Sequence, residues 1–281
     1  MNIQELKNIF TLKSGYKNNF EVISFVESEL TSIGIAYEKL DDGTIFSLKD
    51  ETLPIFSAHM DTIRTKKDDN ASGKVKIIEV EKTNGKKVEA IINKNHILGG
   101  DDVCGIYIIL NLLKENNKLN FIFTNNEEVS GRQTARDFNA DKDISNFPYM
   151  IVLDRKGNSD IICYLNNYGS KDFEDDLIEI GEDFGFRQNR GYFCDADFFR
   201  NQISVANLSC GYYFPHSNKE AVVFEDVVNT FNYCKEIVRV LIGRKYEVNP
   251  ETFSWAFERQ IINNFINTYS SAFGRNYKET L

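Results

Sequence analysis

The chain has 281 residues, of which 42% are hydrophobic and 13% aromatic, and its formal net charge is −9. This apolar content is enough for a large buried core, which excludes disorder of the whole chain. The acidic balance, without a stripe of lysine and arginine, excludes nucleic acid as a favoured partner. No run of about 18 apolar residues is present, so we expect no membrane-spanning segment.

The N-terminal segment and the cysteines indicate the compartment. Residues 1–10 lack a basic stretch followed by an apolar one, so we expect no secretory signal. The five cysteines are scattered and form no Cys-x-x-Cys pair, which favours reduced, mostly buried thiols. These features predict a soluble, cytoplasmic protein.

The first half of the chain contains one clear helix pattern and several strand patterns. Apolar residues in 20–33 have the spacing of an amphipathic helix. Residues 37–48 predict two short strands around a turn, and 53–58 predict a buried strand. The alternation in 74–92 predicts a solvent-facing hairpin, which we expect to cover a sheet edge.

Helix and strand patterns alternate in the second half. Residues 103–113 predict a buried helix, and the apolar runs 119–124 and 150–153 predict central strands. Further helices are predicted over 173–184, 222–242 and 251–271. The alternation predicts an α/β fold with a mixed, mostly parallel central sheet flanked by helices.

Polar residues of the kinds that bind metal ions follow these strands. In chain order the segments are His59-x-Asp61, Asp101-Asp102, Glu127-Glu128, Asp154 and Pro215-His216-Ser217. Because the carboxyl ends of parallel strands meet at one edge of a sheet, we expect these side chains to lie together. Their order predicts the site of a two-metal hydrolase.

The first and third segments show why each fragment alone is weak evidence. In an extended segment His59 and Asp61 point to the same side, so Asp61 could orient the imidazole while its other nitrogen binds a cation. A histidine after a strand is also an ordinary structural residue. Glu127 and Glu128 would repel each other without a cation nearby. The alternative is a pair of solvated glutamates that opens a helix.

The remaining segments also have ordinary alternatives. Asp101 and Asp102 could cap a helix, and Asp154 could be a turn residue. His216 lies in a loop whose glycine and proline favour a fixed conformation. His96 fits no ligand position, and we interpret it as structural.

Taken together, the residues balance between two cations. Each cation receives one histidine and one acidic residue, and an aspartate is shared between them. Imidazole and carboxylate ligands suit two Zn²⁺ ions, with Co²⁺ or Mn²⁺ as possible substitutes. Metals about 3.5–4 Å apart can clamp the oxygens of a tetrahedral intermediate while a neighbouring glutamate transfers protons.

The five segments, in this order, resemble the pattern of the co-catalytic zinc exopeptidases, the clan that contains peptidase T, aminoacylase and the zinc aminopeptidases. The resemblance covers roughly residues 18 to 240. It implies that His59 and Asp154 bind one metal ion, that Glu128 and His216 bind the other, and that Asp101 bridges them.

The resemblance also implies roles for residues around the ligands. Glu127 would be the general base, Asp61 would orient His59, and Asp195 would have a supporting role. A cis peptide bond is implied after Asp101. Val103 departs from the family pattern, because many relatives have a lysine there, but that lysine is not a metal ligand.

One departure concerns the domain organisation. Peptidase T and aminoacylase insert a lid or dimerisation domain between the positions of Asp154 and His216, whereas only 61 residues intervene here. We therefore expect a single catalytic domain over 1–243, similar to that of the single-domain aminopeptidases, without the insert. Residues 244–281 are expected to form a helical extension that makes an oligomer contact or folds over the cleft.

The resemblance implies a metal-dependent hydrolase of amide or peptide bonds. An aspartate at Asp154 favours an aminopeptidase or small-peptide hydrolase, acting on a small peptide. An N-acyl amidohydrolase acting on an N-acyl amino acid is the nearest alternative. Two others are a catalytically silent family member that serves as a binding or assembly subunit, and a cyclase with a single zinc ion. A homo-oligomer is compatible with each.

Overall fold

The computed structural model describes residues 1–15, 18–115, 118–129, 133–192 and 194–248. The chain divides into two compact units, Met1–Asn249 and Pro250–Leu281, and the description below concerns the first. The helix predicted over 251–271, and with it most of the extension predicted over 244–281, lies outside the described residues.

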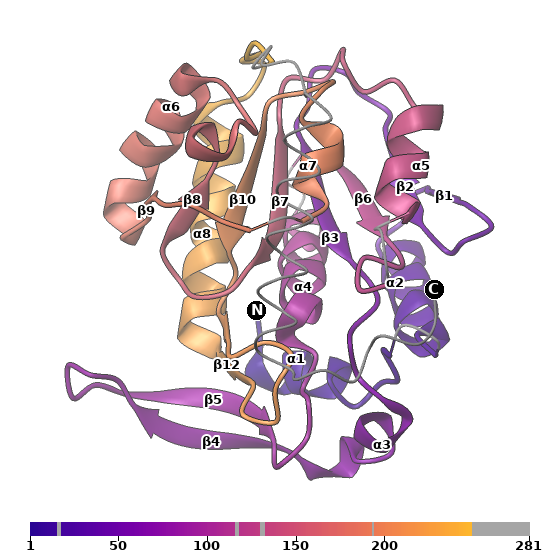
Figure 1. Ribbon diagram of the computed structural model, residues 1–281, viewed down its shortest axis with the longest axis vertical. Coiled ribbons are helices and arrows are strands. Elements are labelled where there is room, and N and C mark those ends of the chain that lie inside the picture. The colour runs from indigo at the N-terminus through magenta and orange to yellow at the C-terminus, as the bar shows by residue number, and fades with distance from the viewer. Residues whose placement is uncertain (16–17, 116–117, 130–132, 193, 249–281) are drawn as a thin grey trace, which may run out of the picture. The chain divides into compact units, whose positions relative to one another are not determined.

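A large mixed sheet forms the centre of the described unit (Figure 1). Its strands, in spatial order, are β1 (Glu38–Lys39), β2 (Ile45–Ser47), β6 (Asn120–Thr124), β3 (Ile55–His59), β7 (Met150–Arg155), β10 (Val205–Ser209), β8 (Asp160–Ile162) and β9 (Arg187–Gln188). The four central strands, from β6 to β10, run parallel. Outside them the pairs β1–β2, β2–β6 and β10–β8 are antiparallel, and β8–β9 is parallel. The mostly parallel sheet predicted from the sequence is confirmed.

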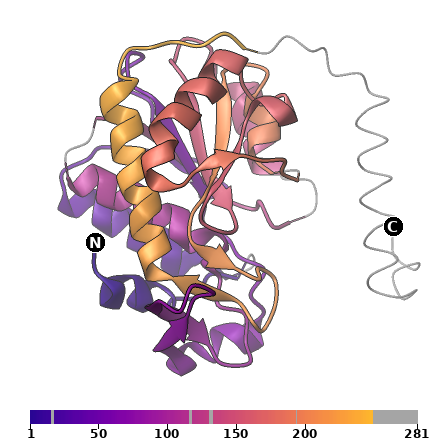
Figure 2. The same cartoon turned by 90° about the vertical axis from the view of Figure 1, so that its left-hand side faces the viewer.

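Helices cover both faces of this sheet. The first face carries α1 (Ile3–Ile9), α2 (Phe20–Ser32), α4 (Gly100–Lys114), α6 (Lys171–Gly181) and α8 (Phe224–Val240), and the second carries α5 (Gln133–Asp141) and α7 (Ala196–Phe199) (Figures 1 and 2). Strand β7 shows how the two cores are divided. Ile151 and Leu153 join the first core, whereas Met150 and Val152 join the second, because side chains alternate along a strand.

Helix α4 packs beneath the centre of the sheet, against β3 and β7, and against α8. Every residue from Val103 to Leu113 is buried, as the mostly apolar pattern predicted, and Asn111 is the polar residue among them. The helix approaches β7 closely at Gly105, where a Cβ atom would lie 2.4 Å from the carbonyl oxygen of Leu153. A glycine is therefore required at this contact.

A second, antiparallel sheet consists of β11 (Tyr212–Tyr213), β12 (Ala221–Val223), β5 (Lys87–Asn93) and β4 (Val75–Glu81). It contains the predicted hairpin of residues 74–92. This hairpin pairs through β5 with β12, in the second sheet. Residues 221–223 lie in that strand, so the helix predicted from residue 222 begins at Phe224.

Short elements complete the described unit: the helix α3 (Lys66–Asp69) and the 3-10 helices η1 (Ser72–Lys74), η2 (Tyr164–Asn166) and η3 (Glu182–Phe184). The predicted helix of residues 20–33 is confirmed by α2, and that of 173–184 by α6 and η3. No helix within the described ranges combines the length and the apolar character that a membrane crossing requires.

Candidate metal centre

The predicted ligands lie at the carboxyl edge of the parallel strands. His59 is the last residue of β3 and pairs in register with Thr124 at the end of β6. Asp154 lies near the end of β7, two residues beyond Val152, which pairs with Ser57 of β3. The sheet register therefore brings His59 and Asp154 to the same level.

His59 is 2% exposed, and the main chain of Asp61 fixes its orientation. Nδ1 of His59 lies 2.8 Å from the backbone oxygen of Asp61. A carbonyl oxygen can only accept, so Nδ1 carries the proton and donates it. The carboxylate of Asp61 is 3.7 Å from the same nitrogen. Both the backbone oxygen and the carboxylate of Asp61 thus face Nδ1 of His59, and the backbone oxygen makes the shorter contact.

The Asp61 carboxylate instead holds the loop that follows β6. Its two oxygens accept the backbone N–H groups of Glu127, at 2.9 Å, and Glu128, at 3.0 Å. Asp61 is 0% exposed, so these two hydrogen bonds are shielded from water. Asp61 therefore positions the glutamate pair with its carboxylate while its backbone oxygen contacts His59.

Asp101 lies between the two histidines, and its two oxygens face different ones. Oδ1 is 3.1 Å from Nε2 of His59, and Oδ2 is 3.2 Å from Nε2 of His216. On the first side, Asp154 Oδ1 lies 3.7 Å from His59 Nε2. On the second side, Glu128 Oε1 lies 2.7 Å from His216 Nε2. The peptide bond between Asp101 and Asp102 is cis, as the resemblance implied.

These contacts define two overlapping groups of possible metal ligands. One is His59, Asp101 and Asp154, and the other is Asp101, Glu128 and His216; within each group the ligand atoms lie within 4.8 Å of one another. A third group of the same kind joins His59, Glu127 and Glu128. The structure thus brings together all five predicted ligands and the predicted base.

The charges in the centre compensate one another. Burial lowers the pKa of His59, but the hydrogen bond to Asp101 and the nearby carboxylates of Asp154 and Asp61 outweigh it and raise that pKa well above its usual value. Burial likewise opposes protonation of His216, yet the carboxylates of Asp101 and Glu128 raise its pKa to about 11. Protonated imidazoles therefore stand between the carboxylates where cations would lie.

The acidic members differ in their response. Burial raises the pKa of Asp154 to about 7, and the neighbouring charge of Asp101 adds to this effect. Burial also raises the pKa of Glu128 to about 7 against the opposing hydrogen bond from His216. Asp101 is buried too, but hydrogen bonds from His216 and His59 lower its pKa. Asp101 is therefore the acid that keeps its charge between the two imidazoles.

Asp195 lies behind the centre, at the start of α7. Its Oδ2 accepts the hydroxyl of Thr124 at 2.7 Å, while Oδ1 is buried and has no hydrogen-bond partner within the described residues. Burial, followed by the charge of Glu127, raises the pKa of Asp195 to about 8. The residue predicted to have a supporting role thus lies in the same electrostatic environment as the predicted base.

Sequence reasoning missed two acids that act on the backbone of the centre. Glu220 is 2% exposed and accepts N–H groups of the loop that leads to Asp101. Asp102 was predicted only as part of a pair, and it accepts the N–H groups of His59, at 3.2 Å, and Gly105, at 3.0 Å. The position of Glu220, four residues after His216, was the only signal available in the sequence.

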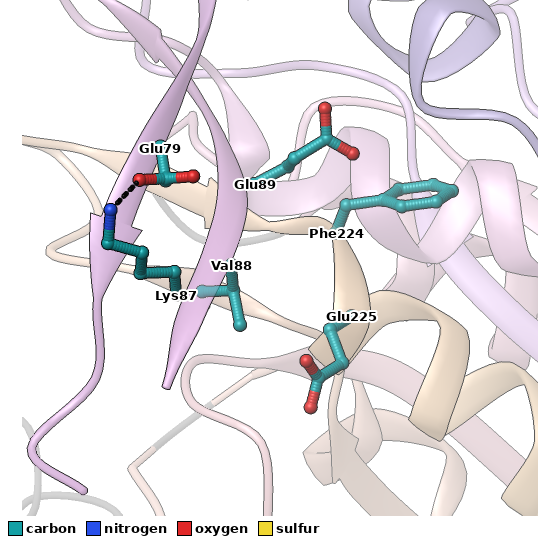
Figure 3. A pocket seen from close by; sticks show the side chains of 6 residues that line it. All are labelled: Glu79, Lys87, Val88, Glu89, Phe224 and Glu225. Atoms are coloured by element: carbon teal, nitrogen blue, oxygen red, sulfur yellow. Dashed lines mark ion pairs between the residues drawn. The ribbon is translucent and has the colours of Figure 1, made fainter. Parts of the chain in front are cut away.

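Two other features lie apart from the centre. His96 contacts Asp68 and Lys74, at 3.3 and 3.2 Å, which agrees with its interpretation as structural. A cavity of about 270 Å³ lies beside β4, β5 and the start of α8 and is lined by Glu79, Lys87, Val88, Glu89, Phe224 and Glu225 (Figure 3). None of the predicted ligands lines it, so we do not assign the candidate site there.

No family model and no curated protein matches the chain. Solved structures do. Aminopeptidase PepT from Bacillus cereus has a TM-score of 0.63 and 16% identity, over 84% of this chain and 96% of that one. A tripeptidase from Staphylococcus aureus has a TM-score of 0.64 and 10% identity, over 85% and 97%.

The TET1 peptidase from Pyrococcus horikoshii, which can assemble into a tetrahedron or a large octahedral shell, has a TM-score of 0.58 and 16% identity, over 84% of this chain and 98% of that one. Identities this low establish the fold and nothing finer. The chain has the fold of these peptidases, which confirms the α/β architecture that the resemblance implied.

Proposed function

We propose that this chain is a two-zinc metallohydrolase of peptide bonds, of the aminopeptidase or small-peptide hydrolase type. The observation that carries the proposal is the position of Asp101, whose two oxygens each face a different histidine. His59 and Asp154 complete the first ligand group, and Glu128 and His216 complete the second. The peptidase fold supports the same reading.

The donor set fits zinc. Ligands about 2.0–2.2 Å from a tetrahedral ion lie about 3.3–3.6 Å from one another. The contacts among the proposed ligands span 2.7 Å, between His216 and Glu128, to 3.7 Å, between His59 and Asp154. Small displacements would therefore admit the ions. When bound, they would polarise the carbonyl group of the substrate and promote ionisation of a water molecule.

Glu127 is the proposed general base. It is 7% exposed and forms a ligand-like group with His59 and Glu128, and its N–H is held by Asp61. Its carboxylate would accept a proton from the attacking water and return it to the leaving amine. Asp61 would contribute by keeping this carboxylate in place, and in the neutral imidazole its carbonyl oxygen would hold the proton on Nδ1 and leave Nε2 of His59 available to a metal ion.

The substrate and the assembly are part of the proposal. A small peptide with a free amino terminus is the preferred substrate, because the neighbouring folds are those of peptidases. An N-acyl amino acid is the alternative, since the same chemistry serves any amide. A catalytic unit over residues 1–243, with residues 244–281 as an extension that contributes to a homo-oligomer, completes the proposal.

Metal content per chain tests the proposal directly. Protein purified without chelators is dialysed against a small excess of zinc and analysed by elemental mass spectrometry. Two zinc ions per chain support the proposal, one favours a mononuclear cyclase-like enzyme, and none indicates a binding or assembly subunit. His216→Gln should lower the zinc content, whereas His96→Gln, which removes the histidine outside the centre, should not.

Activity on aminoacyl and N-acyl substrates separates the peptidase from the deacylase. Glu127→Gln should retain both zinc ions and lose turnover, because it removes the base without removing a ligand. A rate within about threefold of wild type would place the base elsewhere.

A further inference from the structure

Glu220 is a buried acid that joins two loops of the proposed centre. It lies just before β12, four residues after His216, and its own N–H donates to the carbonyl oxygen of Ser217 at 3.1 Å. The side chain is turned toward the loop that precedes α4. Its Oε2 accepts the N–H groups of Leu98, at 2.9 Å, and Gly99, at 2.8 Å.

The same carboxylate reaches the backbone of a proposed ligand. Its Oε1 accepts the N–H of Asp101 at 3.3 Å. Gly99 has a φ of 84°, a left-handed conformation that places successive N–H groups around one acceptor. Three main-chain donors thus converge on one buried carboxylate, and charge-assisted hydrogen bonds of this kind are stronger than neutral ones.

The start of α4 packs closely against β11 and β12, the two strands that flank the loop of His216. A Cβ atom at Gly100 would lie 2.8 Å from Tyr212 and from Val222, and 3.2 Å from Oε1 of Glu220. The loop that carries His216 is also constrained, because His216 has a φ of 61°. The nitrogen Nε2 of His216 and the oxygen Oδ2 of Asp101 face each other at 3.2 Å across this junction.

We propose that Glu220 is a positioning residue that ties the loop of Asp101 to the loop of His216 and so fixes the distance between these two side chains. The inference rests on the proposed function, in which both residues hold the second zinc ion. Outer contacts that orient metal ligands typically alter metal affinity by about 10–100-fold when they are lost. Glu220 accepts the backbone N–H of Asp101, so its effect would pass through the main chain.

Glu220→Gln tests this role with little change in shape. The amide oxygen can still accept, but the amide nitrogen faces an N–H group and cannot. We expect the affinity for the Zn²⁺ ion on the His216 side to fall about 10–100-fold in competition with a chelator, and the affinity on the His59 side, which shares Asp101, to fall less. The absorption spectrum of the Co²⁺-loaded protein should change mainly for the ion on the His216 side.

Glu174→Gln is the matched control. Glu174 is also a buried glutamate, 0% exposed, and it accepts the N–H of Tyr164 at 2.9 Å, but its contacts lie around η2 and α6. This variant should keep both Zn²⁺ affinities and the Co²⁺ spectrum. A general loss of stability caused by removing any buried glutamate would affect both variants alike.

Amide hydrogen exchange provides a readout without metal. In the metal-free wild type the amides of Leu98, Gly99 and Asp101 should be protected, and in Glu220→Gln their exchange should accelerate about tenfold or more. Fast exchange of these amides in the wild type would overturn the inference even if the variant did not fold. If the wild type binds two Zn²⁺ ions and Glu220→Gln retains both affinities, the inference about Glu220 is overturned and the proposed function is not. If the wild type binds no Zn²⁺, the proposed function itself is overturned.

Discussion

Replacing Asp61 by asparagine tests the finding that its carboxylate holds the glutamate loop. The two buried hydrogen bonds from the N–H groups of Glu127 and Glu128 measure 2.9 and 3.0 Å. Hydrogen bonds to a charged group contribute about 1.5–3 kcal/mol each, and a buried donor left unsatisfied costs about 1–3 kcal/mol. Asparagine keeps one acceptor, loses the charge and turns its amide toward the other N–H group. We expect the free energy of unfolding to fall by about 3–5 kcal/mol.

Urea unfolding of the metal-free proteins measures this change through the midpoint at constant slope. The control is Asp50→Asn, because the exposed carboxylate of Asp50 also accepts a backbone N–H, that of Thr52 at 2.9 Å, but in contact with water. The control should unfold close to the wild type. An Asp61→Asn midpoint that matches the wild type would refute the assignment of the carboxylate to the glutamate loop.

The same variant separates two routes to lost activity. The carbonyl oxygen of Asp61 accepts a hydrogen bond from Nδ1 of His59 at 2.8 Å, and the substitution leaves this oxygen unchanged. We therefore expect the Zn²⁺ affinity on the His59 side to persist while kcat falls about 100-fold, since a displacement of about 1 Å has that effect. If zinc is instead lost from the His59 side, and the molecules that still hold it keep a normal kcat, the result would favour the role predicted from the sequence, in which the Asp61 side chain orients His59.

Three further predictions concern protonation and packing. The carboxylates of Asp101 and Glu128 raise the pKa of His216 to about 11 in the metal-free protein, so Zn²⁺ binding at pH 7.5 should release about one proton or more. Titration calorimetry in buffers of different ionisation enthalpy measures this release, and equal heats in all buffers would contradict the prediction. The pKa of Asp195 is raised from 3.8 to about 8, so between these values the folded state keeps a proton that the unfolded state has lost, and stability falls as pH rises. In Asp195→Asn the free energy of unfolding should fall less steeply with pH than in the wild type, by up to about 1.4 kcal/mol per pH unit between pH 5 and 8. Urea unfolding of the metal-free proteins measures this, and the same pH dependence in both proteins would count against the prediction. Gly105→Ala should lower the free energy of unfolding by about 3 kcal/mol although alanine favours helices, whereas Gly73→Ala, where nothing lies within 4 Å, should have little effect; thermal unfolding compares the two.

The elements that the sequence predicted are those whose apolar pattern matches their burial. The helix spacing of residues 20–33 corresponds to α2 because one face of that helix is buried. Strands β3, β6 and β7 are mostly apolar because both faces of the central sheet are covered. Strand β10 was not predicted. It contains Asn207, whose side-chain amide is buried. This amide donates to the carbonyl oxygen of Asp154 and accepts the N–H of Asp154, both at 3.0 Å, and these hydrogen bonds offset the free-energy cost of burying it.

The candidate site was predicted in its residues but not in its contacts. The apolar runs in the sequence predict where the parallel strands end, and the polar residues that follow these runs were therefore expected at one edge of the sheet. The atom of Asp61 that meets His59 depends on where the extended backbone stops, and β3 stops at His59 itself. The role of Glu220 depends on a pairing between β12 and β5, residues separated widely in the chain, which no local pattern predicts.

Several buried acids of the centre fall into two kinds according to the partners of their carboxylate oxygens. Asp61, Asp102 and Glu220 accept main-chain N–H groups, and each thereby holds a segment that carries a proposed ligand or the proposed base. Asp154 and Glu128 instead direct an oxygen at an imidazole. Burial raises the pKa of acids of both kinds, to about 7 for Asp154, Glu128 and Glu220 and well above the usual value for Asp102. The two kinds therefore differ in their hydrogen-bond partners: main-chain donors hold the first kind, whereas protons or cations compensate the charge of the second. A metal centre built in this way can lose its ions without losing the framework that positions their ligands.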